Sequence, residues 1–394
     1  MAVTAGDLLA LVRTGRAHTR SDLRRLTGLS RTAVVSRVSA LAEAGLLLLG
    51  EELSSTGGRP PGSLVFNTGA GVVLAAAIGR SRSQVGVFDL AGTELAADSL
   101  DHEIGAGPDA VLDPVVRRLG ELMAGLDQPA LLGIGVSLPG TVDPVRGVSV
   151  DSPVMGGWDG VDLVPHLAPL GAGTPVFVAN DADVLARSEQ LGHGAAYDDL
   201  IVVKASTGLG LGIVADGRVV AGHLGAAGEI GHTKVAEAQG RRCRCGDTGC
   251  LETVAAGWAL VPQLAETGRE VGHVRELTGL ALAGDAEARA LLRESGRRLG
   301  EVLAVAINLL NPQAVVIGGD MAAAFDTYAA GVRESVYARA SALATRDLQV
   351  LPATFGDRAG LVGCAAMALE AVLSPDAVDA RLLEGAGQAQ PSVS

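Results

Sequence analysis

The sequence predicts a small N-terminal winged helix-turn-helix domain, built of helices with a short β wing, followed by a large α/β region of two lobes. Three observations favour this fold class. The first 62 residues are basic whereas the remainder is acidic, a helix-turn-helix pattern lies within the basic part, and short apolar strands dominate beyond about residue 67. We therefore expect a domain boundary near residue 66.

Charge and composition limit the classes of function. Residues 1–62 carry eight Arg against five Asp or Glu, a net charge of +3, whereas the rest of the chain has a net charge of −16. An acidic surface repels a nucleic acid backbone, so we expect any such contact to be confined to the basic segment. The chain shows no charged-then-apolar leader and no apolar run of about 20 residues, which indicates a cytoplasmic protein without a membrane partner.

The basic segment has the pattern of two helices joined by a tight turn. Residues 20–27 form the first expected helix, and Ser30 caps the second, 31–44, because its hydroxyl can accept hydrogen bonds from the first backbone amides. Each helix has an apolar face directed inward. The residues of these faces are Leu23, Leu26, Val34, Val38 and Leu41.

Polar side chains near the start of the second helix lie where a helix-turn-helix reads the major groove. Two short strands, 46–49 and 63–66, follow, and the Gly- and Pro-rich segment between them resembles the wing of a winged helix. An arginine in that wing suits a narrow minor groove. The predicted DNA-contacting residues are Ser30, Arg31, Thr32, Ser36, Arg37 and Arg59. The alternative is a small three-helix interaction module whose arginines are only solvated.

Beyond residue 67 the pattern is that of two related α/β lobes. Each opens with a strand, 72–78 in the first and 200–204 in the second, followed by a glycine-containing turn and another strand, which indicates an internal duplication. A cleft between such lobes is where a small ligand binds. The expected domains are residues 1–66, a first lobe 67–187 joined by the C-terminal helix 360–373, and a second lobe 188–359.

Three of the four cysteines lie within eight residues, at Cys243, Cys245 and Cys250, and His232 ends a Gly-Glu-Ile-Gly-His run just upstream. Three thiolates and one imidazole supply the donors and the tetrahedral count that zinc prefers, and they leave no open position for a catalytic water. We therefore predict a structural Zn²⁺ in the second lobe. The alternative is a group of buried thiols beside a core histidine, but burial does not explain the clustering, and Cys243 is too close to Cys245 for an easy disulfide.

These segments resemble the ROK family of sugar kinases and sugar-responsive repressors. The resemblance rests on the C-x-C-G-x2-G-C-x-E run that ends at Glu252, the Gly-Glu-Ile-Gly-His run at 228–232, Leu138-Pro139-Gly140, and Asn180-Asp181 after a strand. It covers essentially the whole chain, because the N-terminal winged helix is similar to that of the repressor branch. The resemblance implies an actin-like, ribonuclease H-like pair of lobes hinged around a sugar cleft.

Carried over residue by residue, the resemblance implies a set of hydroxyl-binding groups. These are Gly140, Ser152, Asn180, Asp181, Glu229, His232 and Glu252. In the kinases of the family the counterpart of Asp181 is the base that takes a proton from the sugar, and the zinc-ligand histidine uses its second ring nitrogen on the sugar. Simpler roles stay open: Asn180 and Asp181 cap the following helix, while Glu229 and Glu252 orient zinc ligands.

One departure separates the two branches of the family. The kinases carry Asp-x-Gly-Gly/Thr at the end of their first strand, and Ala77 stands where that aspartate belongs. Without the carboxylate the magnesium-phosphate clamp is incomplete, so we expect no catalytic residue and treat Asp181 as a vestigial base position. A glycine-rich turn at 206–212 remains, and it is typical either of a phosphate cradle or of a tight strand connection.

We therefore predict a sugar-responsive DNA-binding regulator, most simply a repressor, that acts as a homo-oligomer, either a dimer or a tetramer. The expected partners are double-stranded operator DNA and a sugar, which is either free or derivatised as a phosphosugar or amino sugar. Two half-sites about 34 Å apart require two winged helices, which favours dimerisation. The alternative is an ATP-dependent sugar kinase with an appended DNA-binding domain.

Overall fold

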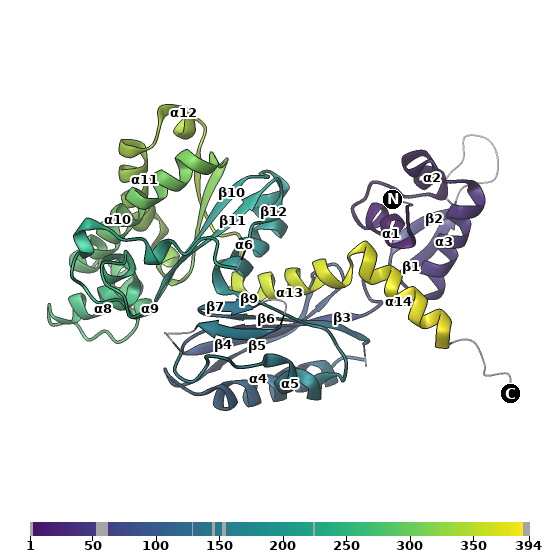
Figure 1. Ribbon diagram of the computed structural model, residues 1–394, viewed down its shortest axis with the longest axis horizontal. Coiled ribbons are helices and arrows are strands. Elements are labelled where there is room, and N and C mark those ends of the chain that lie inside the picture. Colours follow the sequence, from purple (N-terminus) through teal and green to yellow (C-terminus); the bar gives the residue numbers. More distant parts are fainter. Residues whose placement is uncertain are drawn as a thin grey trace.

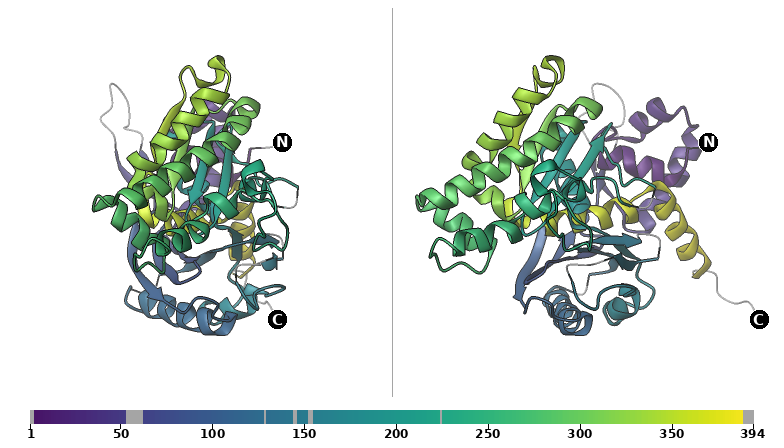
Figure 2. Two further views of the ribbon diagram at one scale, coloured as in Figure 1. Left: turned by 90° about the vertical axis from the view of Figure 1, so that its left-hand side faces the viewer. Right: turned by 60° about the vertical axis from the view of Figure 1, so that its left-hand side comes forward.

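The computed structural model describes residues 3–52, 62–127, 129–143, 146–151, 155–223 and 225–388. It contains two α/β lobes and, at one end, an N-terminal domain that rests on the C-terminal helices (Figure 1). Two turned views show that the N-terminal domain and the last helix stay side by side (Figure 2).

The N-terminal domain is a winged helix. Its elements are α1 (Ala5–Arg13), α2 (Arg20–Thr27), α3 (Arg31–Glu43), β1 (Leu47–Glu52) and β2 (Gly62–Phe66), the two strands being antiparallel. The cap at Ser30 is present, since its Oγ accepts a hydrogen bond from the Ala33 amide at 3.2 Å. The inward orientation predicted for Leu26 is wrong: its side chain is 38% exposed, and Leu29, beyond the helix end, packs against the core instead. Helix α1 was not anticipated from the pattern.

Within the described residues, the lobes contain two five-stranded mixed sheets. The first has the order β5-β4-β3-β6-β9 and the second has the order β12-β11-β10-β13-β14. The strands of the first sheet are β3 (Val72–Ile78), β4 (Arg82–Asp89), β5 (Glu94–Asp101), β6 (Leu131–Leu138) and β9 (Val176–Asn180). Those of the second are β10 (Leu200–Ala205), β11 (Leu209–Ala215), β12 (Arg218–Val219), β13 (Ala314–Gly318) and β14 (Gln349–Pro352). A further ribbon pairs β7 (Thr141–Asp143) with β8 (Val148–Asp151).

The two sheets have the same construction. In each, the first strand pairs antiparallel with the second and parallel with the fourth, so that β3 corresponds to β10 and β6 to β13. This correspondence agrees with the internal duplication expected from the sequence. The interior strands β3 and β13 are buried along nearly their whole length, which explains their continuous apolar runs.

Helices cover the faces of the sheets. Helices α4 (Pro108–Ala124) and α5 (Leu163–Leu167) lie on the outer side of the first sheet, whereas α6 (Asp181–Leu191) packs against β10, β11 and α13 (Ala359–Val372) near the junction of the lobes (Figure 1). The other helices are α7 (Glu252–Ala255), α8 (Gly257–Ala265), α9 (Val274–Leu282), α10 (Ala286–Leu310), α11 (Phe325–Arg339), α12 (Ala342–Thr345) and α14 (Pro375–Gln388). The long α10 and α11 pack closely because Gly296, Gly300 and Gly331 lie at their contact.

A continuous apolar core joins the N-terminal domain to the first lobe. Leu8 and Val38 of the winged helix belong to the same buried cluster as Leu361 and Val378 of the C-terminal helices. Helix α14 packs on α1, where the Gly6 amide donates to Asp379 Oδ1 at 2.9 Å. A side chain at position 6 would collide with the Pro375 backbone, so the two helices approach closely only because this residue is glycine.

Among the described residues, no single helix is long and apolar enough to cross a membrane. One bent pair, Gly356–Val372 with Pro375–Gly385, passes that test by length and composition.

Candidate functional site

The main cavity of the described residues lies between the two lobes and has a volume of about 950 Å³, within the range of small-molecule sites. It is lined by the ends of β3 and β6, the start of α6, the turn after β10 and the cysteine loop. Six of the seven predicted sugar-binding residues line it: Gly140, Asn180, Asp181, Glu229, His232 and Glu252. The seventh, Ser152, lies outside the described residues, as does Arg59 of the predicted wing.

Asn180 connects two of the segments on which the family resemblance rests, Leu138-Pro139-Gly140 and Asn180-Asp181. Its Nδ2 donates to the Gly140 carbonyl at 2.7 Å, and its Oδ1 accepts from the Ala182 amide at 2.7 Å, capping α6. Gly140 has a φ of +93°, a conformation that favours glycine. The capping role proposed as the simpler reading is therefore present, and it leaves Asn180 with one hydrogen and one acceptor lone pair for a ligand.

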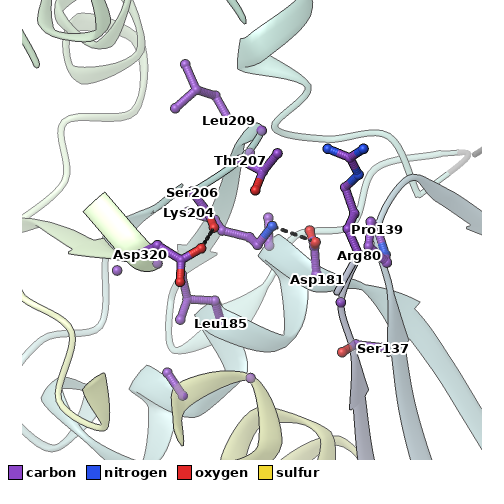
Figure 3. A pocket seen from close by; sticks show the side chains of 18 of the residues that line it. Arg80, Ser137, Pro139, Asp181, Leu185, Lys204, Ser206, Thr207, Leu209 and Asp320 are labelled. Carbon is purple, nitrogen blue, oxygen red and sulfur yellow. Dashed lines mark hydrogen bonds and ion pairs between the residues drawn. The ribbon is translucent and has the colours of Figure 1, made fainter. Parts of the chain in front are cut away.

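Asp181, at the first turn of α6, forms an ion pair that the sequence did not suggest. Its Oδ2 lies 2.6 Å from Lys204 Nζ on β10, and Figure 3 shows the two side chains pointing toward each other across the cavity floor. Burial by itself lowers the pKa of Lys204, but the charges of Asp181, Asp320 and Glu252 outweigh it, so the pKa is raised. The only feature of the sequence that could have drawn attention to Lys204 was the rarity of lysine, since the chain has two.

Asp183, two residues further along α6, also lines the cavity and is 8% exposed. Burial raises the pKa of its carboxyl group to about 6, and the charges of Asp181 and Glu229 act in the same direction, whereas Arg187 lowers it. The start of α6 thus holds two carboxyl groups with different environments, one paired with a lysine and the other largely desolvated.

Glu252 and Glu229 differ in burial. Glu252 is buried, and its two oxygens accept hydrogen bonds from the Leu209 amide at 2.7 Å and from Trp258 Nε1 at 3.2 Å. Glu229 is exposed to the cleft, with Oε2 3.8 Å from His232 Nε2. Glu252 therefore fixes the turn before β11 and the tryptophan, whereas Glu229 presents its carboxylate to the cavity.

The four predicted metal ligands converge, with their donor atoms all within 4.8 Å of one another. The Cys245 and Cys250 sulfurs are 3.8 Å apart, and Cys243 Sγ is 3.7 Å from His232 Nδ1. Two sulfurs bound tetrahedrally to zinc at about 2.3 Å are separated by about 3.8 Å, whereas a disulfide needs about 2.05 Å. The donor set and spacing fit a tetrahedral metal ion. Because His232 turns Nδ1 toward the sulfurs, its Nε2 faces the cleft.

The glycine-rich turn is shorter than the sequence suggested. Ala205 pairs with Leu209, so 206–208 form the loop of a hairpin and the later glycines belong to β11. The Ser206 hydroxyl donates to Asp320, which follows β13, and this contact faces the cavity (Figure 3). The simpler reading, a tight strand connection, describes this geometry. Ala77, at the end of β3, lines the same cavity and offers no carboxylate.

On the N-terminal domain, Ser30, Arg31, Thr32 and Ser36 are exposed at the start of α3. Arg37 is half-buried, and its Nη1 donates to the Ala33 carbonyl at 3.3 Å, so its guanidinium follows the helix. The four exposed residues form one accessible helix end, which is the geometry that major-groove reading requires.

Comparisons with known proteins agree with this architecture. The sequence profile described as "ROK family" matches residues 73–371. The chain is 28% identical over 355 residues to the xylose repressor of Bacillus subtilis, covering 89% of this chain and 91% of the relative. It is 30% identical over 378 residues to the DNA-binding transcriptional dual regulator NagC of Escherichia coli, covering 90% of this chain and 89% of that protein.

Two solved structures complete the comparison. A ROK family transcriptional regulator, described as a homolog of the E. coli MLC protein, superposes with a TM-score of 0.81 at 27% identity and covers 98% of this chain and 99% of its own. A ROK family glucokinase from Streptomyces griseus, solved with glucose and AMPPNP, gives a TM-score of 0.63 at 29% identity and covers 76% of this chain and 99% of its own. The predicted fold class is confirmed by these matches.

Proposed function

Because the chain belongs to the ROK family, we propose that it acts as a sugar-responsive transcriptional repressor. It binds operator DNA through the N-terminal winged helix and a sugar in the cleft between the lobes. A role on operator DNA implies a cytoplasmic location. Sugar binding to one arrangement of the lobes then redistributes the protein between states of different operator affinity.

The winged helix is the observation that carries this proposal. The regulator of known structure matches nearly the whole chain, including this domain, whereas the glucokinase matches about three quarters of it. In the operator complex, the start of α3 lies in the major groove, with Ser30, Arg31, Thr32 and Ser36 near the bases and Arg37 beside the phosphates. Arg59 takes the minor-groove role expected of the wing.

In the cleft, the sugar is held by groups that differ in charge and burial. Asp181 and Glu229 accept hydrogen bonds from sugar hydroxyls, and Asn180 donates one with its remaining hydrogen. His232 contributes Nε2 while Nδ1 binds a structural zinc together with the three cysteines. Glu252 acts mainly by holding the turn before β11. Gly140 lines the same cleft, and Ser152, which lies outside the described residues, stays a predicted ligand-binding residue.

Phosphoryl transfer is the second candidate, since kinases share the fold. Three features of the cleft disfavour it. Ala77 supplies no carboxylate for a metal-phosphate clamp. Lys204 forms an ion pair with the carboxylate of Asp181, the position of the catalytic base in the kinases. The negatively charged Asp320 accepts a hydrogen bond from Ser206 of the glycine-rich turn, where a phosphate would have to bind. Protein with magnesium-ATP and a panel of hexoses is expected to release no sugar-dependent ADP. Turnover above background would make the protein a kinase.

Helices α13 and α14 provide the route from the cleft to the DNA-binding domain. Ala359 and Gly360, at the start of α13, line the cavity, and α14 at the other end packs on α1. A displacement of α13 on lobe closure therefore reaches the winged helix through packed side chains. We propose that the protein is a homo-oligomer, dimer or tetramer, because two winged helices about 34 Å apart are needed for two half-sites.

Operator binding with and without sugars tests the proposal. Full-length protein is expected to bind its upstream intergenic DNA, and at least one sugar of a panel is expected to change the affinity. Deletion of residues 1–66 should abolish DNA binding and keep sugar binding. Arg37→Ala should weaken binding to all sequences, with a smaller salt dependence, because it removes a phosphate contact. Operator binding by the truncated protein, or indifference to every sugar, would contradict the proposal.

A further inference from the structure

One large apolar side chain of α3 is exposed among polar ones. Helix α3 has four large apolar residues, and three of them, Val34, Val38 and Leu41, are completely buried. The fourth, Val35, is 42% exposed. Helix α3 packs on α1, α2 and β1, and Figure 1 shows the winged helix at the opposite end of the molecule from the second lobe. The core of the domain therefore does not use most of the surface of Val35.

Val35 lies beside two of the predicted DNA-contacting residues. It is three residues after Thr32, and Ser36 is four residues after Thr32, so the three side chains project from adjacent positions on one side of the helix. All three are exposed. A surface that contacts Thr32 and Ser36 is thus also within reach of Val35.

Helix stability does not explain a valine at this position. A β-branched side chain loses freedom about χ1 in a helix, so an exposed valine is less favourable there than an alanine. The same restriction leaves Val35 with one strongly preferred rotamer, which means that its methyl groups are oriented before a partner binds. Little further conformational entropy is lost when such a side chain makes a contact. Val35 is therefore better suited to a contact with a partner than to the helix itself.

The charge around Val35 and the chemistry of the bases identify that contact. Residues 1–62 have a net charge of +3, and Arg31 is exposed at the start of α3, as a DNA-binding surface requires. The hydroxyl groups of Thr32 and Ser36 can hydrogen-bond with several base edges. Of the four bases, only thymine presents a methyl group in the major groove. A valine between two hydroxyl-bearing side chains therefore fits thymine better than any other base.

We propose that Val35 packs against the 5-methyl group of a thymine in the operator and so selects an A·T pair at that position. The inference rests on the proposed function and assigns a specificity-determining residue to its DNA site. Phosphate contacts supply affinity for DNA of any sequence, whereas the contact with a methyl group is made only where the base is thymine. Loss of Val35 should consequently change discrimination between sequences more than it changes affinity for unrelated DNA.

Replacement of thymine by uracil tests the contact, because it removes the methyl group and keeps every hydrogen-bonding group of the base. A tight-binding duplex is first selected from random DNA with the full-length protein, and each thymine is then replaced singly by deoxyuridine. At one thymine position or more, we expect the wild type to bind the uracil duplex about threefold more weakly or worse, since one apolar contact is lost. Val35→Ala should bind the two duplexes within about 1.5-fold of each other, and unrelated DNA within about twofold of the wild type.

Two further variants assign the effect to this side chain. Val35→Ile keeps a branched apolar group and should keep the sensitivity to uracil. Val305→Ala is the matched control, because Val305 is also an exposed valine in a helix but lies on α10 of the second lobe, so its loss should leave the sensitivity unchanged. The melting temperature of Val35→Ala should equal or exceed that of the wild type, which separates loss of the contact from loss of the fold.

The outcomes distinguish this proposal from the repressor proposal. If the wild type tolerates uracil at every thymine of the selected duplex, or if the sensitivity persists unchanged in Val35→Ala, Val35 does not read a methyl group. Selective binding of that duplex would leave the repressor proposal standing in either case. If the full-length protein selects no sequence from random DNA, both proposals fail.

Discussion

Replacement of Asp183 by Asn should stabilise the protein at neutral pH. Burial raises the pKa of this carboxyl group from its ordinary value of 3.8 to about 6 in the folded protein. Between about pH 4 and 6 the folded state therefore holds more protons than the unfolded state, and stability falls as pH rises through that window. Above pH 6 the full cost of the buried charge is present.

The size of the effect follows from the pKa. The difference between 3.8 and about 6 corresponds to about 3 kcal/mol at 25 °C, an upper value because Asp183 lines an open cavity and solvent screens part of the cost. Asn keeps the shape of the side chain and carries no charge. The variant should thus melt up to about 5–10 °C above the wild type at pH 7 and close to it at pH 4.

Thermal unfolding of both proteins at pH 4 to 8 measures this difference. Asp113→Asn, on the exposed face of α4, controls for the general loss of one negative charge from an acidic protein. If the difference in melting temperature between Asp183→Asn and wild type is the same at pH 4 and pH 7, burial of the carboxylate is not the cause of that difference. A variant no more stable than wild type at pH 7 would refute the reasoning as well.

Three further predictions concern the metal, the ion pair and the helix contact. Cys245→Ser should lower the zinc content, measured by elemental analysis, and abolish the sugar response in operator titrations while circular dichroism shows that residues 1–66 stay folded; a metal-free wild type that responds normally would contradict this. Lys204→Met should lower the free energy of unfolding by about 2–3 kcal/mol, because it leaves Asp181 uncompensated, and adding Asp181→Asn should recover most of the loss in denaturant melts. Asp379→Ala removes the acceptor for the Gly6 amide and should reduce the sugar-induced change in operator affinity, with binding in the absence of sugar kept within about threefold; an unchanged response would exclude α14 as the route.

Much of the secondary structure could be read from the pattern, and the exceptions have physical causes. The strand 72–78 and the helix 20–27 were predicted with the bounds they have, because apolar runs and caps mark them locally. Strand β5 was missed because it lies at the sheet edge, has no buried residue and alternates too weakly between apolar and polar residues to form an apolar run. Leu26 was placed inward by its spacing, but α2 is only eight residues long and its last turn passes beyond the core.

The sequence by itself determined the chemistry that is local along the chain. The four candidate metal ligands lie within 19 residues and the predicted DNA-contacting residues of α3 lie within one helix, so spacing and turn geometry suffice to bring each group together. Tertiary structure alone decided which distant groups meet. The contacts of Lys204 with Asp181 and of α14 with α1 depend on how the two sheets and their helices pack. Packing is set by the burial of whole apolar faces, which no short motif encodes.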